Sequence, residues 1–209
     1  MKNVLLFLFV FGALSATNVS TARAQGNSAP AQQPPSVSSV LNANYGIVER
    51  EIVSAAEAMP EDKYSFAPTT GEFKGVRTFA EEVKHIAFAN HLYFGPLMGE
   101  NIDTTHIGEE VNGPANIKTK AEIVQYLKDS FALGHRALSG ITAENQVTPL
   151  PKPLFPFLAT RLAIASIAMW HPMDHYGQMV EYLRMNGIVP PASRPQPPHQ
   201  PASQPKSQK

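Results

Sequence analysis

Residues 170–178 read Trp-His-Pro-Met-Asp-His-Tyr-Gly-Gln, within a segment that predicts one long helix from about Leu162 to Asn186. His171 and His175 are four positions apart, so on a helix they stand only about 40° apart around the axis and about 6 Å apart along it. Both imidazoles can therefore reach a single point in space, as two metal-ligating histidines on one helix do. Such pairs also arise by chance as surface or satisfied core histidines, and the spacing alone does not separate the two interpretations.

Pro172 stands directly after the first of these histidines. It cannot donate a hydrogen bond to the carbonyl of Ala168, and it disfavours helical angles at His171. The sequence therefore predicts a kink or a local bulge at this point, or two helices in place of one.

Apolar stripes with the helical period recur along the chain, at about residues 38–58, 78–94, 119–138 and 162–186. Two of these segments open with a capping box, formed by Thr78 with Glu81 and by Thr119 with Glu122. No stretch alternates convincingly with period two, so the pattern predicts an all-α protein and, with four stripes, a four-helix bundle. The connection at residues 99–117 is long enough for the next helix to cross the bundle rather than return as an immediate neighbour.

The two ends of the chain differ in composition from this helical part. Residues 1–24 combine Lys2, an apolar run at 4–11 and a small-residue cleavage site at 22–24, which predicts a secretory signal peptide; a retained membrane anchor is the alternative. Residues 25–35 and the Pro/Gln-rich residues 194–209 are expected to be a disordered linker and tail. One domain remains, at residues 36–193, in a protein expected to be periplasmic or secreted, with no membrane attachment after cleavage.

Composition excludes several kinds of site. The chain has no cysteine, so disulfides, thiolate metal sites and a cysteine nucleophile are ruled out. Any metal must be held by His, Asp or Glu, which favours Zn, Ni, Fe, Cu or Mn. Basic and acidic residues number 17 each, and the basic ones form no stripe, so nucleic acid is not an expected partner.

A metal site at His171 and His175 needs a third ligand, and His85 is the histidine best placed to supply it. It lies at the edge of the apolar stripe of the second helix. Three neutral imidazoles from two helices leave a coordination position open for water or substrate. Of the other histidines, His199 lies in the tail and His106 in the long connection. His91 lies on an outward-leaning face, and His135 has no second histidine at helical spacing.

Four other residues near these histidines are weaker candidates for a role in the site. Glu82, one turn before His85, could orient that imidazole, although a solvated surface glutamate is the more common case. Trp170 and Tyr176 could line a pocket, although such residues on a bundle helix are more often core. Asp174 is expected at the surface or behind the ligands rather than among them.

Several stretches resemble the DinB-like family. Residues 83–87 (Val-Lys-His-Ile-Ala) and 171–178 carry the histidines, and residues 182–191 (Tyr-Leu-Arg-Met-Asn-Gly-Ile-Val-Pro-Pro) are similar to the closing signature of that family. Residues 59–68 resemble its exit from the first helix. The resemblance covers nearly all of residues 36–193.

The resemblance implies a four-helix bundle with up-down-down-up topology, often dimeric, and a divalent metal site at His85, His171 and His175. Zn, Ni, Fe and Mn are the expected ions. Family activities include thiol-dependent transfer, isomerisation and hydrolysis, and an exported member is not expected to meet a cytoplasmic thiol. We therefore expect an exported metal-binding protein, a metal-dependent hydrolase of an unidentified small molecule. The alternatives are a non-catalytic metal-binding or stress-related protein, a thiol-dependent transferase and a structural helical module without metal.

Overall fold

The structure is a computed structural model that describes residues 34–100, 102 and 107–195. The predicted signal peptide, nearly all of the predicted linker and most of the predicted tail lie outside these residues, so those three predictions stay untested. Within the described ranges, no helix is both long and apolar enough to cross a membrane.

The described part of the chain folds into four long helices, which confirms the all-α prediction. They are α1 (Val37–Ala58), α2 (Phe79–Phe94), α4 (Lys120–Ser139) and α5 (Arg161–Met185). Four short helical turns lie in the connections, and a fifth follows α5: η1 (Glu61–Lys63), η2 (Gly95–Met98), α3 (Ile107–Glu110), η3 (Pro156–Leu158) and, after α5, η4 (Pro191–Ser193).

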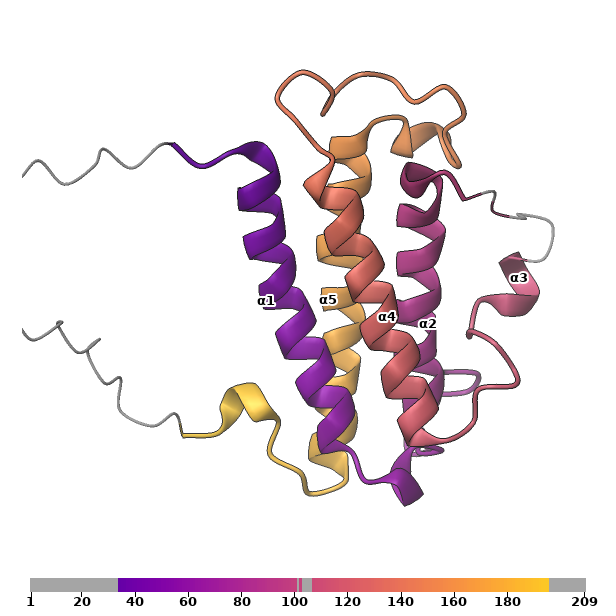
Figure 1. Cartoon of the computed structure of the whole chain (residues 1–209). Coiled ribbons are helices and arrows are strands. Elements are labelled where there is room, and N and C mark those ends of the chain that lie inside the picture. Colours follow the sequence, from indigo (N-terminus) through magenta and orange to yellow (C-terminus); the bar gives the residue numbers. More distant parts are fainter. Residues whose placement is uncertain (1–33, 101, 103–106, 196–209) are drawn as a thin grey trace, which may run out of the picture. The chain divides into compact units, whose positions relative to one another are not determined.

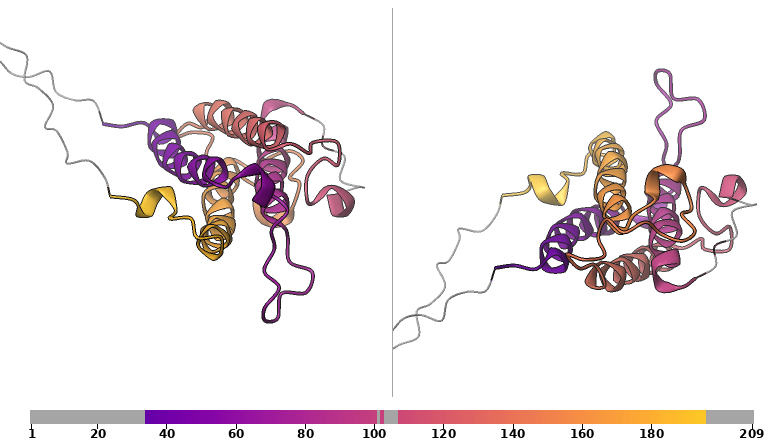
Figure 2. Two further views of the ribbon diagram at one scale, coloured as in Figure 1. Left: turned by 90° about the horizontal axis from the view of Figure 1, so that it is seen from below. Right: turned by 90° about the horizontal axis from the view of Figure 1, so that it is seen from above.

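The long helices form a bundle in which α1 and α5 run in one direction and α2 and α4 in the other (Figure 1). Each helix packs against two neighbours, in the order α1, α4, α2, α5 around the bundle, and the end-on views of Figure 2 place α1 opposite α2. This is the up-down-down-up topology that the resemblance implied.

The long connection between α2 and α4 corrects one expectation. We expected it to carry the next helix across the bundle, but α4 lies directly beside α2 and packs against it more extensively than any other helix does. The two helices are parallel, so the chain must return along the full length of α2 before α4 can begin (Figure 1). The length of the connection reflects this parallel return.

The helix starts follow from local chemistry. Both predicted capping boxes are present. The side chains of Thr78 and Thr119 each accept a hydrogen bond from the backbone N–H of the glutamate three residues later, and the carboxylate of that glutamate accepts one from the backbone N–H of the threonine. Thr160 caps α5 in the simpler way, by accepting the N–H of Ala163. These caps fix where α2 and α5 begin, and therefore which side chains face each other across the bundle.

Pro172 does not divide the last helix. α5 is continuous from Arg161 to Met185 with Pro172 buried inside it, so a single helix is the correct interpretation. The carbonyl of Ala168 loses its usual helical donor because proline has no N–H. The helix nevertheless keeps His171 and His175 on the same face.

Candidate metal centre

His85 of α2 and His171 and His175 of α5 converge inside the bundle. One ring nitrogen of each lies within 4.8 Å of the corresponding nitrogens of the other two. His85 and His175 are only 8% and 6% exposed, and His171 is partly buried. The structure thus brings together the three residues that the sequence singled out, and three such side chains could hold a metal ion.

The closest pair of nitrogens has the spacing that one ion requires. Nε2 of His85 and Nε2 of His171 are 3.3 Å apart. Two nitrogens bound to one tetrahedral Zn²⁺ at about 2.0–2.1 Å each stand roughly 3.3–3.4 Å apart. The pair therefore fits two ligands of one tetrahedral ion without rearrangement of the helices.

In two of the three rings, the nitrogen that points away from the centre is hydrogen-bonded to an acceptor. Nδ1 of His85 donates to the backbone carbonyl of Val111, and Nδ1 of His175 lies 2.6 Å from the carboxylate of Glu82, which is 1% exposed. With the proton fixed on Nδ1, each ring presents the lone pair of Nε2 to the centre. Metal-ligating histidines are usually oriented in this way.

Glu82 therefore has a different role from the one expected. We considered it as a partner of His85, one turn away on the same helix, but its carboxylate reaches across to His175 on α5. The partner of His85 is instead a backbone carbonyl in the connection after α3. A backbone acceptor leaves no mark in the sequence, so sequence reasoning missed Val111.

His171 is the ring whose hydrogen bonds are incomplete. Its Nδ1 is buried and has no hydrogen-bond partner among the residues that the structure describes. If Nε2 carries the proton, it can donate to His85, but Nδ1 then keeps a bare lone pair. If Nδ1 carries the proton, two Nε2 lone pairs face each other. An ion between the two Nε2 atoms removes that repulsion, so the donor set fits a metal better than it fits a metal-free hydrogen-bond network.

Two of the rings, those of His85 and His171, are also in the protonation state that metal binding needs. Burial is the main cause that lowers the pKa of His85 to about 4, and the charges of Arg77 and His175 lower it further. Burial, followed by the neighbouring His175 and His85, lowers the pKa of His171 to about 3. Both imidazoles are neutral at neutral pH, so their lone pairs are free to coordinate a cation.

The segment that carries Val111 is tied to α2 by further contacts. Lys84 Nζ donates to the Pro114 carbonyl at 3.2 Å, and Arg77 Nε donates to Asn112 Oδ1 at 2.8 Å. Gly113 has φ +74° and passes so close to α2 that a Cβ there would lie 2.7 Å from Lys84 Cβ. A side chain at this position would push the segment, and with it the Val111 carbonyl, away from His85.

The remaining candidates lie elsewhere. His91 stacks on Tyr126 of α4, and His135 is hydrogen-bonded to Asn42 and Glu49 of α1. Trp170 is 59% exposed, so it is neither a core residue nor the wall of an enclosed pocket. The hydroxyl of Tyr176 donates a hydrogen bond to the carboxylate of Glu51. Asp174 is exposed.

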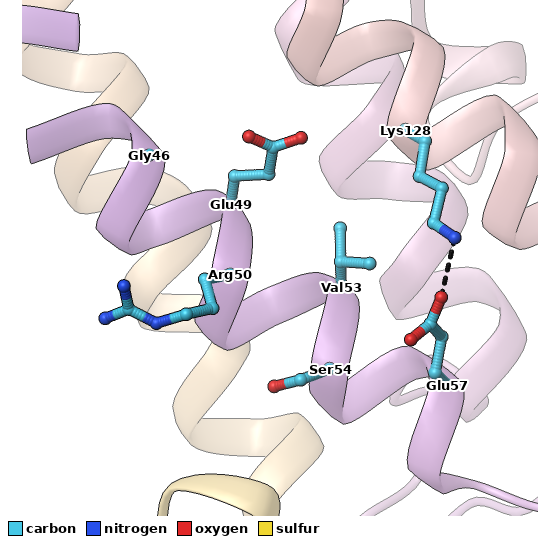
Figure 3. Close-up of a pocket in the computed structure, with 7 residues that line it drawn as sticks. All are labelled: Gly46, Glu49, Arg50, Val53, Ser54, Glu57 and Lys128. Carbon is cyan, nitrogen blue, oxygen red and sulfur yellow. Dashed lines mark ion pairs between the residues drawn. The ribbon is translucent and has the colours of Figure 1, made fainter. Parts of the chain in front are cut away.

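The cavity drawn in Figure 3 is separate from the histidines. It has a volume of about 420 Å³ and is lined by six residues of α1 and by Lys128 of α4. Lys128 of α4 bridges to Glu57 of α1 at 2.6 Å beside it. None of the three converging histidines lines this cavity, so it offers no access to the centre.

The fold and the centre define a class of protein, namely an up-down-down-up helical bundle with three histidines converging between α2 and α5. The DinB superfamily model matches residues 45–179, which include all three histidines, and the chain belongs to this superfamily. No curated protein matches the chain. Superfamily membership and the histidine group together fit a metal-binding protein.

Proposed function

We propose that the protein is an exported metal-dependent hydrolase whose divalent ion is bound by His85, His171 and His175. The observation that carries the metal part of this proposal is the convergence of three ring nitrogens from two helices within 4.8 Å. The 3.3 Å spacing of one pair supports it, and so does the anchoring of His175 by the buried Glu82. Zn, Ni, Fe and Mn suit an all-imidazole site.

Other residues of the chain orient the histidine rings, and the burial of the rings limits their contact with solvent. Glu82 and the Val111 carbonyl fix the tautomers of His175 and His85, and both histidine side chains are less than a tenth exposed to solvent. An ion bound by these three histidines would act as a Lewis acid toward a water molecule or a substrate oxygen. Three protein ligands would leave a coordination position for such an exogenous ligand, which a purely structural site does not need.

A non-catalytic metal-binding protein is the second candidate, and one observation favours it. His85 and His175 are both less than a tenth exposed, and the cavity of Figure 3 does not reach them. Of the three rings only that of His171 is partly exposed, so the centre is largely closed to solvent. A centre closed in this way suits an ion held without turnover.

The metal proposal is tested by elemental analysis of protein purified without an affinity tag. We expect about one divalent ion per chain in the wild type, and a loss of most of it in the variants His85→Ala and His175→Ala. His91→Ala is the matched control, because His91 stacks on Tyr126 and takes no part in the centre. Unchanged metal content in both variants would show that the site is wrongly assigned.

The hydrolase proposal needs a separate measurement. A panel of ester, amide and thiol substrates is assayed with metal-loaded protein, with chelated protein and with the two histidine variants. Turnover of an ester or amide that disappears on chelation supports hydrolysis, and turnover only with a thiol supports the transferase alternative. Metal binding without turnover of any substrate in the panel favours the non-catalytic candidate.

Export and assembly are part of the same proposal. In an expressing bacterium we expect the mature protein outside the cytoplasm with Gln25 as its first residue, which fractionation and intact-mass measurement test. A full-length chain in the cytoplasm would contradict export. We also propose a homodimer, and light scattering of the purified mature chain tests it.

A further inference from the structure

One side of α5 exposes large apolar side chains. Leu162, Trp170 and Met173 are 36%, 59% and 37% exposed. Together with the exposed Ser166 and Gly177, they recur every three or four residues and therefore lie on one side of the helix, which we call the α5 outer face. A contiguous set of exposed apolar side chains marks a surface that another segment or molecule covers.

This exposed apolar surface continues onto α1. The hydroxyl of Tyr176 on α5 donates to Glu51 on α1, so the two helices are side by side at this level. Met173 lies one turn before Tyr176, and Ile47, which is 50% exposed, lies one turn before Glu51. Because α1 and α5 run in the same direction, Ile47 and Met173 lie at the same level of the bundle (Figure 1). The surface is therefore formed by two neighbouring helices.

The described part of the chain ends next to this surface. After α5 the chain turns back, and η4 packs against α1 (Figure 1). Arg184, in the last turn of α5, donates to the hydroxyl of Ser193 in η4 at 3.1 Å. Arg184 lies seven positions after Gly177 and thus on the same side of the helix. Residues 196–209 therefore follow a segment that is fixed at one end of the α5 outer face.

The composition and length of residues 196–209 suit this surface. They include four prolines at positions 197, 198, 201 and 205. Proline-rich segments favour the polyproline II conformation and dock on exposed aromatic side chains with little loss of conformational entropy.

The spacing of the prolines matches the position of the tryptophan. In the polyproline II conformation the chain advances about 3.1 Å per residue, which places Pro197 and Pro201 about 12 and 25 Å from Ser193. Along α5, at about 1.5 Å per residue, Met173 and Trp170 lie about 16 and 21 Å from Arg184. The first three prolines can therefore lie against these two side chains.

Charge favours this occupant over a second copy of the chain. Between Arg161 and Arg184, α5 has no lysine or arginine, and its two acidic residues, Asp174 and Glu181, are exposed. Two copies that met through the α5 outer face would bring acidic side chains against acidic side chains. Residues 196–209 contain two lysines, one histidine and no acidic residue, so their charge is complementary to that of the helix.

We propose that residues 196–209 dock along the α5 outer face and cover Trp170. Because the segment is tethered beside this face, its effective concentration there is in about the millimolar range, and weak contacts are sufficient. The ring of Trp170 lies 6.2 Å from that of His171, measured between centroids, so the docked segment lies beside the least buried of the three histidines. The inference does not rest on the proposed metal site.

The fluorescence of Trp170 tests the proposal, because it is the only tryptophan of the chain. Metal-free protein of residues 25–209 is compared with protein of residues 25–195, both in dilute solution, by emission spectra and acrylamide quenching. We expect a blue-shifted emission and weaker quenching in the longer protein, and the loss of both effects in the shorter one. A peptide of residues 196–209 should restore them in the shorter protein at about millimolar concentration.

Two variants of the longer protein examine the register. The triple variant Pro197→Ala/Pro198→Ala/Pro201→Ala keeps the length and charge of the segment but favours the polyproline II conformation less, and it should be quenched like the shorter protein. Pro205→Ala is the matched control. In the extended segment this residue lies about 37 Å from Ser193, beyond Trp170, so the control should be quenched like the unaltered protein. Circular dichroism checks that all these proteins have the same helix content.

Each result decides for or against the proposal. Equal quenching in the longer and shorter proteins overturns it. Shielding of Trp170 that persists in the shorter protein and disappears on dilution also overturns it, because a second copy then covers the face. An equal loss of shielding in Pro205→Ala and in the triple variant overturns the register on Trp170. Because the protein is metal-free throughout, failure of the proposed metal site leaves this test unchanged.

Discussion

The carboxylate of Glu82 lies 2.6 Å from Nδ1 of His175, and both side chains are buried where α2 meets α5. A buried carboxylate beside an imidazole fixes the ring and raises the basicity of its other nitrogen. Glu82 is therefore a positioning residue for the candidate metal centre rather than one of its ligands.

Replacement of this carboxylate tests that role. Glu82→Gln should lower the affinity for the divalent ion by about 10- to 100-fold, because the amide still accepts from Nδ1 but carries no charge. Competition with a chromophoric chelator measures the affinity. Glu57→Gln, which removes a charge from an exposed ion pair, is the control and should bind the ion like the wild type. Equal affinity in Glu82→Gln would mean that the carboxylate does not act on the centre.

The stability of the metal-free protein should fall as the pH is lowered. The pKa of His85 in the folded state is about 4 and that of His171 about 3, below the ordinary value of about 6.5. Between these values the unfolded chain binds more protons than the folded chain, so stability rises with pH. On acidification, the contribution of these two histidines to the free energy of unfolding is lost from about pH 6.5 downward. The loss ends when His85 and His171 are protonated in the folded state as well.

Denaturant unfolding of the metal-free chain at a series of pH values between 7 and 4 checks this prediction. Carboxylates also titrate toward the lower end of that range, so the comparison is with the double variant His85→Gln/His171→Gln. The double variant should show a flatter dependence between pH 6.5 and 5. An identical dependence in both proteins would mean that these two histidines do not contribute.

Gly113 should be required for metal binding although it is not a ligand. Its positive φ disfavours other residues, and a Cβ would collide with Lys84 and displace the segment that carries the Val111 carbonyl. Gly113→Ala should therefore weaken metal affinity as well as stability. Gly75→Ala is the matched control, because Gly75 also has a positive φ (+82°) but nothing lies within 4 Å of its Cβ position. If the control loses as much metal affinity, backbone strain rather than the close approach explains the effect.

Gly134 in α4 should resist a substitution that usually stabilises helices. Replacement of an interior helical glycine by alanine typically gains about 1 kcal/mol. Here the new Cβ would lie 2.6 Å from the hydroxyl of Tyr45 and 2.8 Å from the ring of Phe94, both of which are fully buried. Gly134→Ala should thus lose about 1–3 kcal/mol through overpacking.

Thermal or denaturant unfolding measures the change at Gly134, with Gly177→Ala of α5 as the control. Among the described residues outside its own helical turn, nothing lies within 4 Å of the Cβ position of Gly177, so this variant should be as stable as the wild type or more stable. A stabilised Gly134→Ala variant would show that Tyr45 and Phe94 can move apart without cost.

The sequence alone determined the parts of this protein that depend on local pattern. Apolar periodicity and capping residues such as Thr78 and Thr119 indicated the four helices, because period and caps are properties of neighbouring residues. The four-residue spacing of His171 and His175 put both rings on one face of a helix for the same reason. The up-down-down-up order came from the family resemblance rather than from the pattern itself.

Only the tertiary structure decided which groups meet across the bundle. Glu82 pairs with His175 rather than with His85, and the Val111 carbonyl fixes His85, because the packing of α2 against α5 and the path of a long connection place these atoms together. Helical period says which face a side chain occupies but not which atom of another element it reaches. The hydrogen bond from Arg77 Nε to Asn112 is of this kind too, since it joins two connections that carry no periodic signal.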